Sequence, residues 1–225
     1  MTVAVVIPAL DEAESIGGVV AAVRGQVTPP VSVIVVDNGS RDATAAVAAA
    51  AGAIVVTQTR RGYGWACRAG CDAAVDSDIV VFLDGDGSMP AEAIPLLLAP
   101  IVAGTADIVC GARVGRRIPM SWHQRAGNRV IGGLLRALYG VRLRELGPFR
   151  AVRTSTLDAL ELPGSRYAWP AQLLARAARR RARIAEVDVG YRERTGGRSK
   201  VSGSVRGSLQ AAWDISRTLL VERVR

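Results

Sequence analysis

Two aspartates in the segment Phe82-Leu83-Asp84-Gly85-Asp86-Gly87 have the spacing of a metal site. In an extended segment, side chains two positions apart point the same way, so the carboxylates of Asp84 and Asp86 can face one cation. Mg²⁺ or Mn²⁺ held by few carboxylates keeps coordination positions open for phosphate oxygens. The alternative interpretation is a polar turn, because Asp-Gly is common in turns.

Two further segments have residues suited to a nucleotide. In Val36-Asp37-Asn38-Gly39-Ser40, the Asp37 carboxylate can accept hydrogen bonds from a base or ribose, unless the segment is only a turn in which Ser40 caps a helix. The stretch Arg60-Arg61-Gly62-Tyr63-Gly64 combines positive charge with glycines that let the backbone approach a diphosphate. The chain has no P-loop and no Gly-x-Gly turn after its first apolar run, which argues against NAD binding and simple nucleoside triphosphate hydrolysis.

The elements that must position these residues alternate along the first half of the chain. Expected strands cover Val3–Ile7, Val31–Val36, Ala53–Thr57, Ile79–Leu83 and Asp107–Gly111. Helices are expected from about Glu14, from Ser40 to Gly52, over 64–75, and from Pro90 to Ala103. This alternation predicts an α/β fold with a mostly parallel central sheet flanked by helices.

Polar side chains follow three of these strands. They are Asp11 and Glu12, then Asp37, then Asp84 and Asp86. Because ligands of parallel sheets bind beyond the carboxyl ends of the strands, we expect these side chains to meet at one edge.

The second half of the chain has a less regular pattern. It predicts helices over Ser121–Tyr139 and Trp169–Arg183, a strand or turn over Phe149–Arg153, a strand over Ile184–Val189, a loop over Tyr191–Gly203 and a final helix. No repeat or long linker divides the chain, so residues 1–225 are expected to form a single domain.

Charge is distributed unevenly within a net charge of +9. Residues 1–112 have five basic and twelve acidic side chains, and residues 113–225 have 24 and eight. An acidic half can hold a divalent cation, and a basic half can hold phosphates or face an anionic membrane. No zinc finger, aromatic ribonucleoprotein motif or basic zipper accompanies the charge, so nucleic acid is not an expected partner.

The apolar segments indicate a cytoplasmic protein, since none is long enough to span a bilayer and the first is too short for a signal peptide. The final helix carries an apolar stripe flanked by arginines, made of Val205, Leu209, Ala212, Trp213 and Leu220. Such a helix can lie peripherally on the inner face of an anionic membrane or dock on the protein core.

Taken together and in this order, the motifs resemble glycosyltransferase family 2, which has the Rossmann-like GT-A fold. The matching segments of the first half are Val6–Glu12, the Val-Asp-Asn-Gly-Ser turn, Arg-Gly-Tyr-Gly and Asp-Gly-Asp. In the second half, Gly111–Arg113, Asn128-Arg129, Leu146–Ala151 and Arg194–Lys200 resemble the dolichyl- and polyprenyl-phosphate sugar synthase branch.

The resemblance implies roles for the matching residues. Residues 1–112 would hold a nucleotide sugar and residues 113–225 an acceptor. The nucleoside would contact Pro8, Ala9, Glu12 and Asp37, and the diphosphate would lie by Arg61 and Gly62. Asp84 would sit by the ribose and the metal, and Asp86 would be the main ligand of Mg²⁺ or Mn²⁺. The donor diphosphate or acceptor phosphate would be bound by Arg113, Arg129, Arg198 and Lys200.

Three more side chains bear on the chemistry. His123 either completes the metal shell, touches a phosphate or is structural. The family often has Asp where this chain has Glu145, and Glu where it has Gln172. A hydroxyl acceptor needs a general base, whereas a phosphate is already ionised. Gln172 therefore favours a phosphate acceptor unless Glu145 serves as the base.

The sequence thus predicts a metal-dependent, inverting glycosyltransferase that moves a sugar from a nucleotide diphosphate sugar to an acceptor, preferably polyprenyl phosphate. Alternatives are a soluble hydroxyl acceptor, a sugar-1-phosphate nucleotidyltransferase, or a non-catalytic protein that binds nucleotide sugar or anionic lipid. The basic segment Arg194–Lys200 is expected to order over bound phosphate. The oligomeric state is left open.

Overall fold

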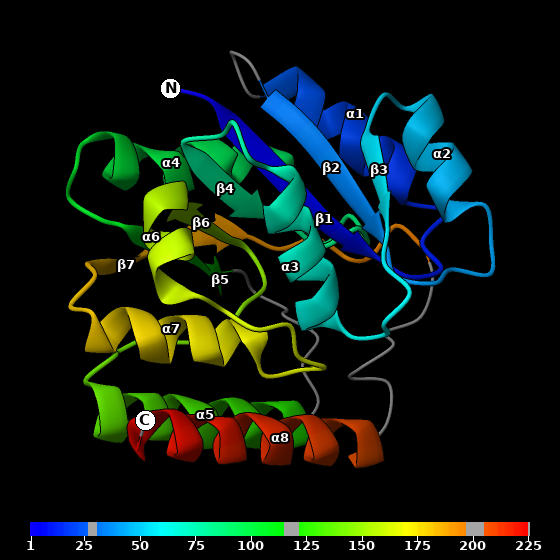
Figure 1. Cartoon of the computed structure of the whole chain (residues 1–225). Helices are drawn as coiled ribbons and strands as arrows, with labels where there is room; N and C mark the ends of the chain where they lie inside the picture. The colour runs from blue at the N-terminus through cyan, green and yellow to red at the C-terminus, as the bar shows by residue number, and fades with distance from the viewer. Residues whose placement is uncertain (27–30, 115–121, 197–204, 225) are drawn as a thin grey trace.

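Within the described residues, the sheet has seven strands in the order β3-β2-β1-β4-β6-β5-β7 (Figure 1). The computed structural model describes residues 1–26, 31–114, 122–196 and 205–224, without the side chains of 122–124 and 205–209. The strands are β1 (Val3–Ala9), β2 (Val31–Asp37), β3 (Ile54–Thr57), β4 (Ile79–Phe82), β5 (Ile108–Val114), β6 (Arg150–Arg153) and β7 (Ile184–Gly190). Of the strands in the described part of the chain, only β6 runs antiparallel to its neighbours, β4 and β5, so the prediction of a mostly parallel α/β sheet is confirmed.

Helices cover both faces of this sheet. One face packs against α1 (Ile16–Gln26), α2 (Thr44–Ala50) and α4 (Ile94–Val102), which follows the short 3₁₀ turn η1 (Ala91–Ala93). The other face packs against α3 (Tyr63–Ala73), α6 (Thr154–Leu160) and α7 (Trp169–Arg179). Below α7 in Figure 1, α5 (Trp122–Tyr139) and α8 (Val205–Val224) lie side by side as an outer layer.

The packing of these helices follows from their residue pattern. The apolar stripe of α1, made of Ile16, Val19, Val20 and Val23, is buried against the sheet. Helix α3 lies close to the sheet at Gly70, where an added Cβ would come within 2.2 Å of Val6 Cγ1. A larger residue at that position would push α3 away from the sheet.

Three sequence expectations need correction. Ser40 does not cap a helix, since α2 begins at Thr44 and Ser40 Oγ instead accepts a hydrogen bond from the Asp11 amide at 3.0 Å. The short helix α6 was missed, and α7 ends at Arg179 rather than Arg183. Arg181 has a φ of 57°, a left-handed conformation that stops the helix and turns the chain into β7.

The final helix docks on the protein core. Its buried stripe, Ala211, Ile215 and Leu219, faces α5 and α7. Among the described residues, no helix has both the length and the apolar character that crossing a bilayer requires.

Candidate active site

The acidic turn begins where β4 leaves the sheet. Asp86 is 3% exposed, and its Oδ1 accepts a hydrogen bond from the Ser88 amide at 2.9 Å. Gly87 has a φ of 74°, which lets the backbone reverse directly after Asp86. The turn therefore holds the Asp86 carboxylate in a fixed, nearly buried position beside the half-buried Asp84.

A cationic side chain from the far end of the chain contacts this carboxylate. Arg194 Nη2 lies 2.7 Å from Asp86 Oδ2, and the Thr195 amide donates a hydrogen bond to the Asp86 carbonyl at 3.1 Å. The Arg192 amide donates to the Ser88 carbonyl at 2.9 Å. Residues 192–195 are therefore held by the acidic turn itself, whereas residues 197–200 of the segment expected to order over phosphate lie outside the described residues.

The electrostatics of the turn favour binding of positive charge. The pKa of Asp84 is raised to about 7, chiefly by removal from water and next by the neighbouring Asp86 carboxylate, against the opposing charges of Arg194 and Arg113. Two carboxylates so close together are destabilised unless a cation lies near them. The Arg194 guanidinium is such a cation in this structure.

The loop after β1 forms a second side of the site. Asp11 has a φ of 53°, and the Arg41 amide donates to Asp11 Oδ1 at 2.7 Å. The Glu12 amide donates to Thr44 Oγ1 at 2.8 Å, and Ser15 Oγ donates to the Gly85 carbonyl at 2.8 Å. These bonds tie the β1–α1 loop to the start of α2 and to the acidic turn.

Asn38 organises the third side, after β2. Its Nδ2 donates to the carbonyls of Gln58 and Arg60 at 3.0 and 2.8 Å, and its Oδ1 accepts from the Gly62 amide at 2.7 Å. The side chain is buried, so these three bonds satisfy polar groups that water does not reach. Asn38 therefore positions the Arg60–Gly62 segment at the edge of the sheet.

These sides enclose a cavity of about 550 Å³. Its lining residues come from the ends of β1, β2 and β4, the start of α3, the segment before α7 and the segment after β7. They are Pro8, Ala9, Leu10, Asp11, Glu12, Asn38, Arg61, Gly62, Tyr63, Ala66, Asp84, Gly85, Asp86, Arg166, Tyr167 and Arg194. Carboxylates and arginines thus share one cavity at the carboxyl ends of parallel strands, the place where such sheets bind ligands.

Seven of the predicted site residues line this cavity: Pro8, Ala9, Glu12, Arg61, Gly62, Asp84 and Asp86. Asp37 is not among the lining residues, since its Oδ1 accepts a hydrogen bond from the Ser40 amide at 3.0 Å and closes the turn. Its neighbour Asn38 takes the position on the cavity wall.

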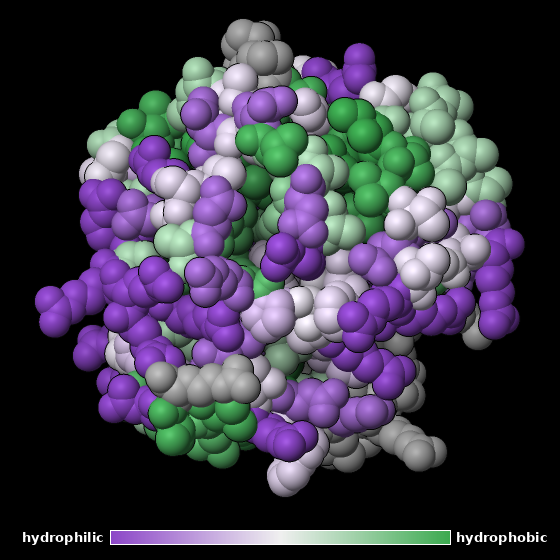
Figure 2. All heavy atoms as spheres, viewed as in Figure 1, coloured by the Kyte–Doolittle hydropathy of each residue, from purple (hydrophilic) through white to green (hydrophobic). Residues whose placement is uncertain are grey.

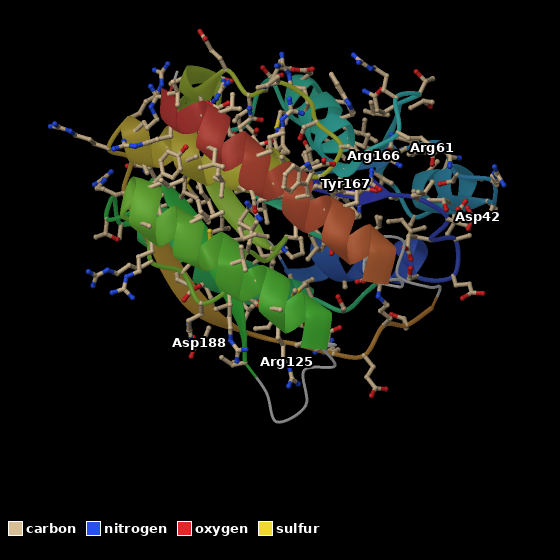
Figure 3. All side chains as sticks on the ribbon, turned by 90° about the horizontal axis from the view of Figure 1, so that it is seen from below. Asp42, Arg61, Arg125, Arg166, Tyr167 and Asp188 are labelled. Carbon is tan, nitrogen blue, oxygen red and sulfur yellow. The ribbon has the colours of Figure 1, made fainter. Side chains whose placement is uncertain are left out.

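Arg166 and Tyr167 also line the cavity but were missed in the sequence (Figure 3). A Cβ at Gly62 would lie 2.8 Å from Arg166 Cα, and one at Gly64 would lie 2.6 Å from the Ser165 carbonyl oxygen. These glycines signal the close approach of another backbone, although not which segment makes it.

Arg113 and Glu145 form a bidentate ion pair beside the cavity. Arg113 Nε lies 2.9 Å from Glu145 Oε1, and Nη2 lies 2.9 Å from Oε2. The Arg113 amide also donates to Glu145 Oε1 at 2.9 Å. Neither residue lines the cavity, and the Glu145 carboxylate that could serve as a base is committed to Arg113.

The remaining predicted residues are not brought to the cavity by the described structure. Arg129 is exposed on α5. His123 lies in the first turn of α5, but its side chain falls outside the described residues, as do Arg198 and Lys200 entirely.

Gln172 faces away from the cavity. Its Nε2 donates to Glu222 Oε1 at 2.6 Å, between α7 and α8. Arg176 Nε and Nη2 lie 3.0 and 2.8 Å from the two Glu222 oxygens. Gln172 therefore packs between helices, and its identity says nothing about the chemistry of an acceptor.

Asp84 and Asp86 suit a hard divalent cation, which prefers oxygen ligands. The Arg194 guanidinium beside Asp86 shows that this point of the cavity accepts positive charge. No cluster of three or more His, Cys, Asp or Glu ligands occurs among the described residues, so phosphate oxygens or water would complete the coordination shell.

Comparison with known proteins agrees with this arrangement. An uncharacterized glycosyltransferase of Mycobacterium tuberculosis is 41% identical over 96% of this chain and 97% of its own length. An undecaprenyl-phosphate mannosyltransferase of Micrococcus luteus is 32% identical over 99% of this chain and 96% of its own length.

Solved structures of glucosyl-3-phosphoglycerate synthase from Mycobacterium tuberculosis share the fold. The complex with Mn²⁺, UDP and phosphoglyceric acid has a TM-score of 0.79 at 28% identity and covers 99% of this chain and 78% of that one. The complex with Mg²⁺ and UDP has a TM-score of 0.77 at 28% identity and covers 98% and 79%.

The fold and these similarities define a glycosyltransferase with the GT-A fold. The model of the family described as Glycosyl transferase family 2 matches residues 4–157, so the chain belongs to that family. The predicted enzyme class and fold are confirmed. The two other classes that the sequence left open, a nucleotidyltransferase and a non-catalytic binding protein, are not supported.

Proposed function

We propose that the chain transfers a sugar from a nucleoside diphosphate sugar to a polyprenyl phosphate, with inversion at the anomeric carbon. The observation that carries this proposal is the cavity in which Asp84 and Asp86 lie with Arg61, Arg166 and Arg194. Carboxylates to hold a cation and guanidinium groups to hold phosphates are the two requirements of a diphosphate leaving group.

The two halves of the chain would divide the work. Most lining residues belong to residues 1–112, which would hold the donor. The second half, residues 113–225, contributes Arg166, Tyr167 and Arg194 and would form the acceptor side. Pro8, Ala9 and Glu12 would contact the nucleoside. Arg61 and the backbone at Gly62 would lie along the diphosphate.

Asp86, assisted by Asp84, would hold Mg²⁺ or Mn²⁺, the ions found with UDP in the structural neighbours. When bound, the cation neutralises charge on the leaving diphosphate. Arg194 would move from Asp86 onto a phosphate oxygen. An acceptor oxygen then attacks the anomeric carbon as the bond from that carbon to the diphosphate breaks.

The acceptor assignment has two supports. The Micrococcus luteus relative is named for undecaprenyl phosphate. In addition, Glu145 is paired with Arg113, so its carboxylate is not free to act as a base. A phosphate acceptor is ionised near neutral pH and needs no base. Because a polyprenyl phosphate is anchored in a bilayer, the protein would also contact a membrane peripherally.

A second acceptor class, a soluble acceptor, is favoured by the structural neighbour whose complex holds Mn²⁺, UDP and phosphoglyceric acid. Both classes can be tested in one assay: a panel of nucleotide sugars with Mn²⁺, offered undecaprenyl phosphate in detergent or 3-phosphoglycerate. We expect transfer to the lipid phosphate. Transfer to 3-phosphoglycerate alone would overturn the lipid acceptor, and donor binding without transfer to either would contradict both.

A further inference from the structure

Helix α8 has two apolar sides, and only one of them is covered. Ala211, Ile215 and Leu219 are buried against the protein. On the opposite side, Trp213 is 71% exposed, Leu220 52% and Val224 88%. These three positions recur at helical spacing and form one outward stripe. Figure 2 shows apolar side chains gathered over the C-terminal end of α8.

Arginines accompany this stripe on both helices of the outer layer. Arg125, Arg129 and Arg136 are exposed on α5, and Arg217 and Arg223 are exposed on α8. Figure 3 views this layer from below, with α5 and α8 side by side and Arg125 near the start of α5. Among the described residues, none of these five arginines forms an ion pair.

Acidic side chains are scarce on the exposed surface of α5 and α8. The chain has no Asp or Glu between Asp107 and Glu145, a stretch that includes all of α5. Of the two acids in α8, Glu222 is buried and paired with Arg176, and Asp214 is half-buried on the flank of the helix. The exposed charge of the described part of this layer is therefore positive.

We infer that the α5–α8 face, defined by Trp213, Leu220, Val224 and the five exposed arginines, binds an anionic lipid bilayer. Lipid headgroups supply the negative charge that the arginines lack, and the apolar stripe enters the boundary between headgroups and acyl chains. Trp213 suits that boundary, because its ring is apolar and its indole N–H is polar.

Charge argues against a second copy of the chain as the occupant. A twofold dimer through this face would place the same positively charged patch on both subunits, so two surfaces of like charge would face each other. The apolar stripe argues against a purely electrostatic partner, because exposed Trp, Leu and Val side chains gain nothing from phosphate groups alone.

The inference deepens the membrane contact that the proposed lipid acceptor requires, but it can be tested without any acceptor. The full chain is floated with vesicles of phosphatidylcholine alone and with vesicles that also contain phosphatidylglycerol, at low and high salt. We expect binding only to the anionic vesicles, with loss of binding at high salt.

Variants separate the two contributions of the face. Trp213→Ser should lower the partition coefficient roughly tenfold through the lost apolar burial. Arg217→Ser should lower it about fivefold. Two control variants lie elsewhere on the surface. Leu96→Ser changes a side chain on α4 that is as exposed as Leu220, at 52%, and Arg41→Ser changes an exposed arginine in the loop before α2. Both controls should bind as the unmodified chain does.

Three results would overturn the inference. The first is equal binding by Trp213→Ser, Arg217→Ser and the unmodified chain. The second is a concentration-dependent dimer, measured by light scattering, that Trp213→Ser dissociates while no vesicle binding is seen. The third is salt-sensitive binding to a DNA oligonucleotide that Arg217→Ser weakens, with no binding to anionic vesicles. Because the vesicles contain no polyprenyl phosphate, failure here leaves the acceptor assay unaffected.

Discussion

The cavity edge and the contact between α7 and α8 are both held by buried polar groups, but they are built differently. At the cavity, the Asn38 side chain bonds to main-chain atoms of a segment that begins 20 residues later. Between the helices, Glu222 meets Gln172 and Arg176, which lie 50 and 46 residues earlier in the chain.

The difference shows which features of the sequence fix the position of a polar side chain. The polar residues of the cavity sit within a few positions of strand ends, so the topology of a parallel sheet brings them together. A polar residue on a helix can face solvent, a ligand or another helix. Its partner is then decided by how the helices pack, as Gln172 demonstrates.

The largest expected effect tests the cavity. Asp86→Ala should abolish Mn²⁺-dependent binding of a nucleoside diphosphate and lower transfer at least about 100-fold, because it removes the buried carboxylate that we propose as the main ligand of the cation. Asp84→Ala should weaken binding without abolishing it. Isothermal titration with Mn²⁺ and UDP or GDP measures both. Asp72→Ala, an exposed acid on α3, is the control, and unchanged affinity in both site variants would show that the site lies elsewhere.

The next effect tests the helix contact. Gln172→Glu should place a second carboxylate against buried Glu222 and lower the free energy of unfolding by about 3 kcal/mol. Urea denaturation measures the loss. The double variant Gln172→Glu with Glu222→Gln exchanges carboxylate and amide and should recover most of it. If Gln172→Glu proves as stable as the unmodified chain, the side chain does not lie where the structure has it.

A smaller effect is expected at the wall of the cavity. Asn38→Ala removes three hydrogen bonds and leaves the Gly62 amide without its acceptor, which should cost about 2 kcal/mol of stability. Nucleoside diphosphate affinity should fall as well, because Arg61 loses its support. Asn38→Asp keeps an acceptor for the Gly62 amide but turns an oxygen towards the Gln58 and Arg60 carbonyls, so it should be no more stable than Asn38→Ala. Loss of stability with full nucleotide affinity would separate Asn38 from the site.

The smallest effect concerns the ion pair across the cavity. Arg194→Ala should raise Mn²⁺ affinity in the absence of nucleotide roughly fivefold, since the cation no longer competes with the guanidinium for Asp86. Arg194→Lys retains the charge and should change the affinity less. Titration followed by the electron paramagnetic resonance of free Mn²⁺ measures this, and an affinity lowered by Arg194→Ala would contradict the competition.

Much of the fold was predictable because its signals are local. The five strands of the first half and the stripe of α1 follow from apolar periodicity. The short helix α6 was missed because its seven residues are too few to show a helical period. The misplaced start of α2 has a different cause: Ser40 could cap a helix, but its hydroxyl has a better-placed partner in the Asp11 amide.

For the site, the residues next to strand ends were predicted, and those brought from a distance were not. Arg166 and Tyr167 reach the cavity only because α3 and the segment before α7 pack at Gly62 and Gly64. Arg113 and Glu145 were assigned to the reaction separately, whereas the structure pairs them with each other.

The sequence by itself determined the alternation of strands and helices in the first half of the chain, the acidic turn after β4 and the charge of each half. Each of these depends on side-chain periodicity, on turn chemistry or on composition, which need no knowledge of distant neighbours. Only the tertiary structure decided that Arg194 pairs with Asp86, that Gln172 turns towards Glu222 and that α8 leaves Trp213 exposed. Those outcomes depend on which helix faces meet, and a buried polar group takes whichever partner the packing places within hydrogen-bonding distance.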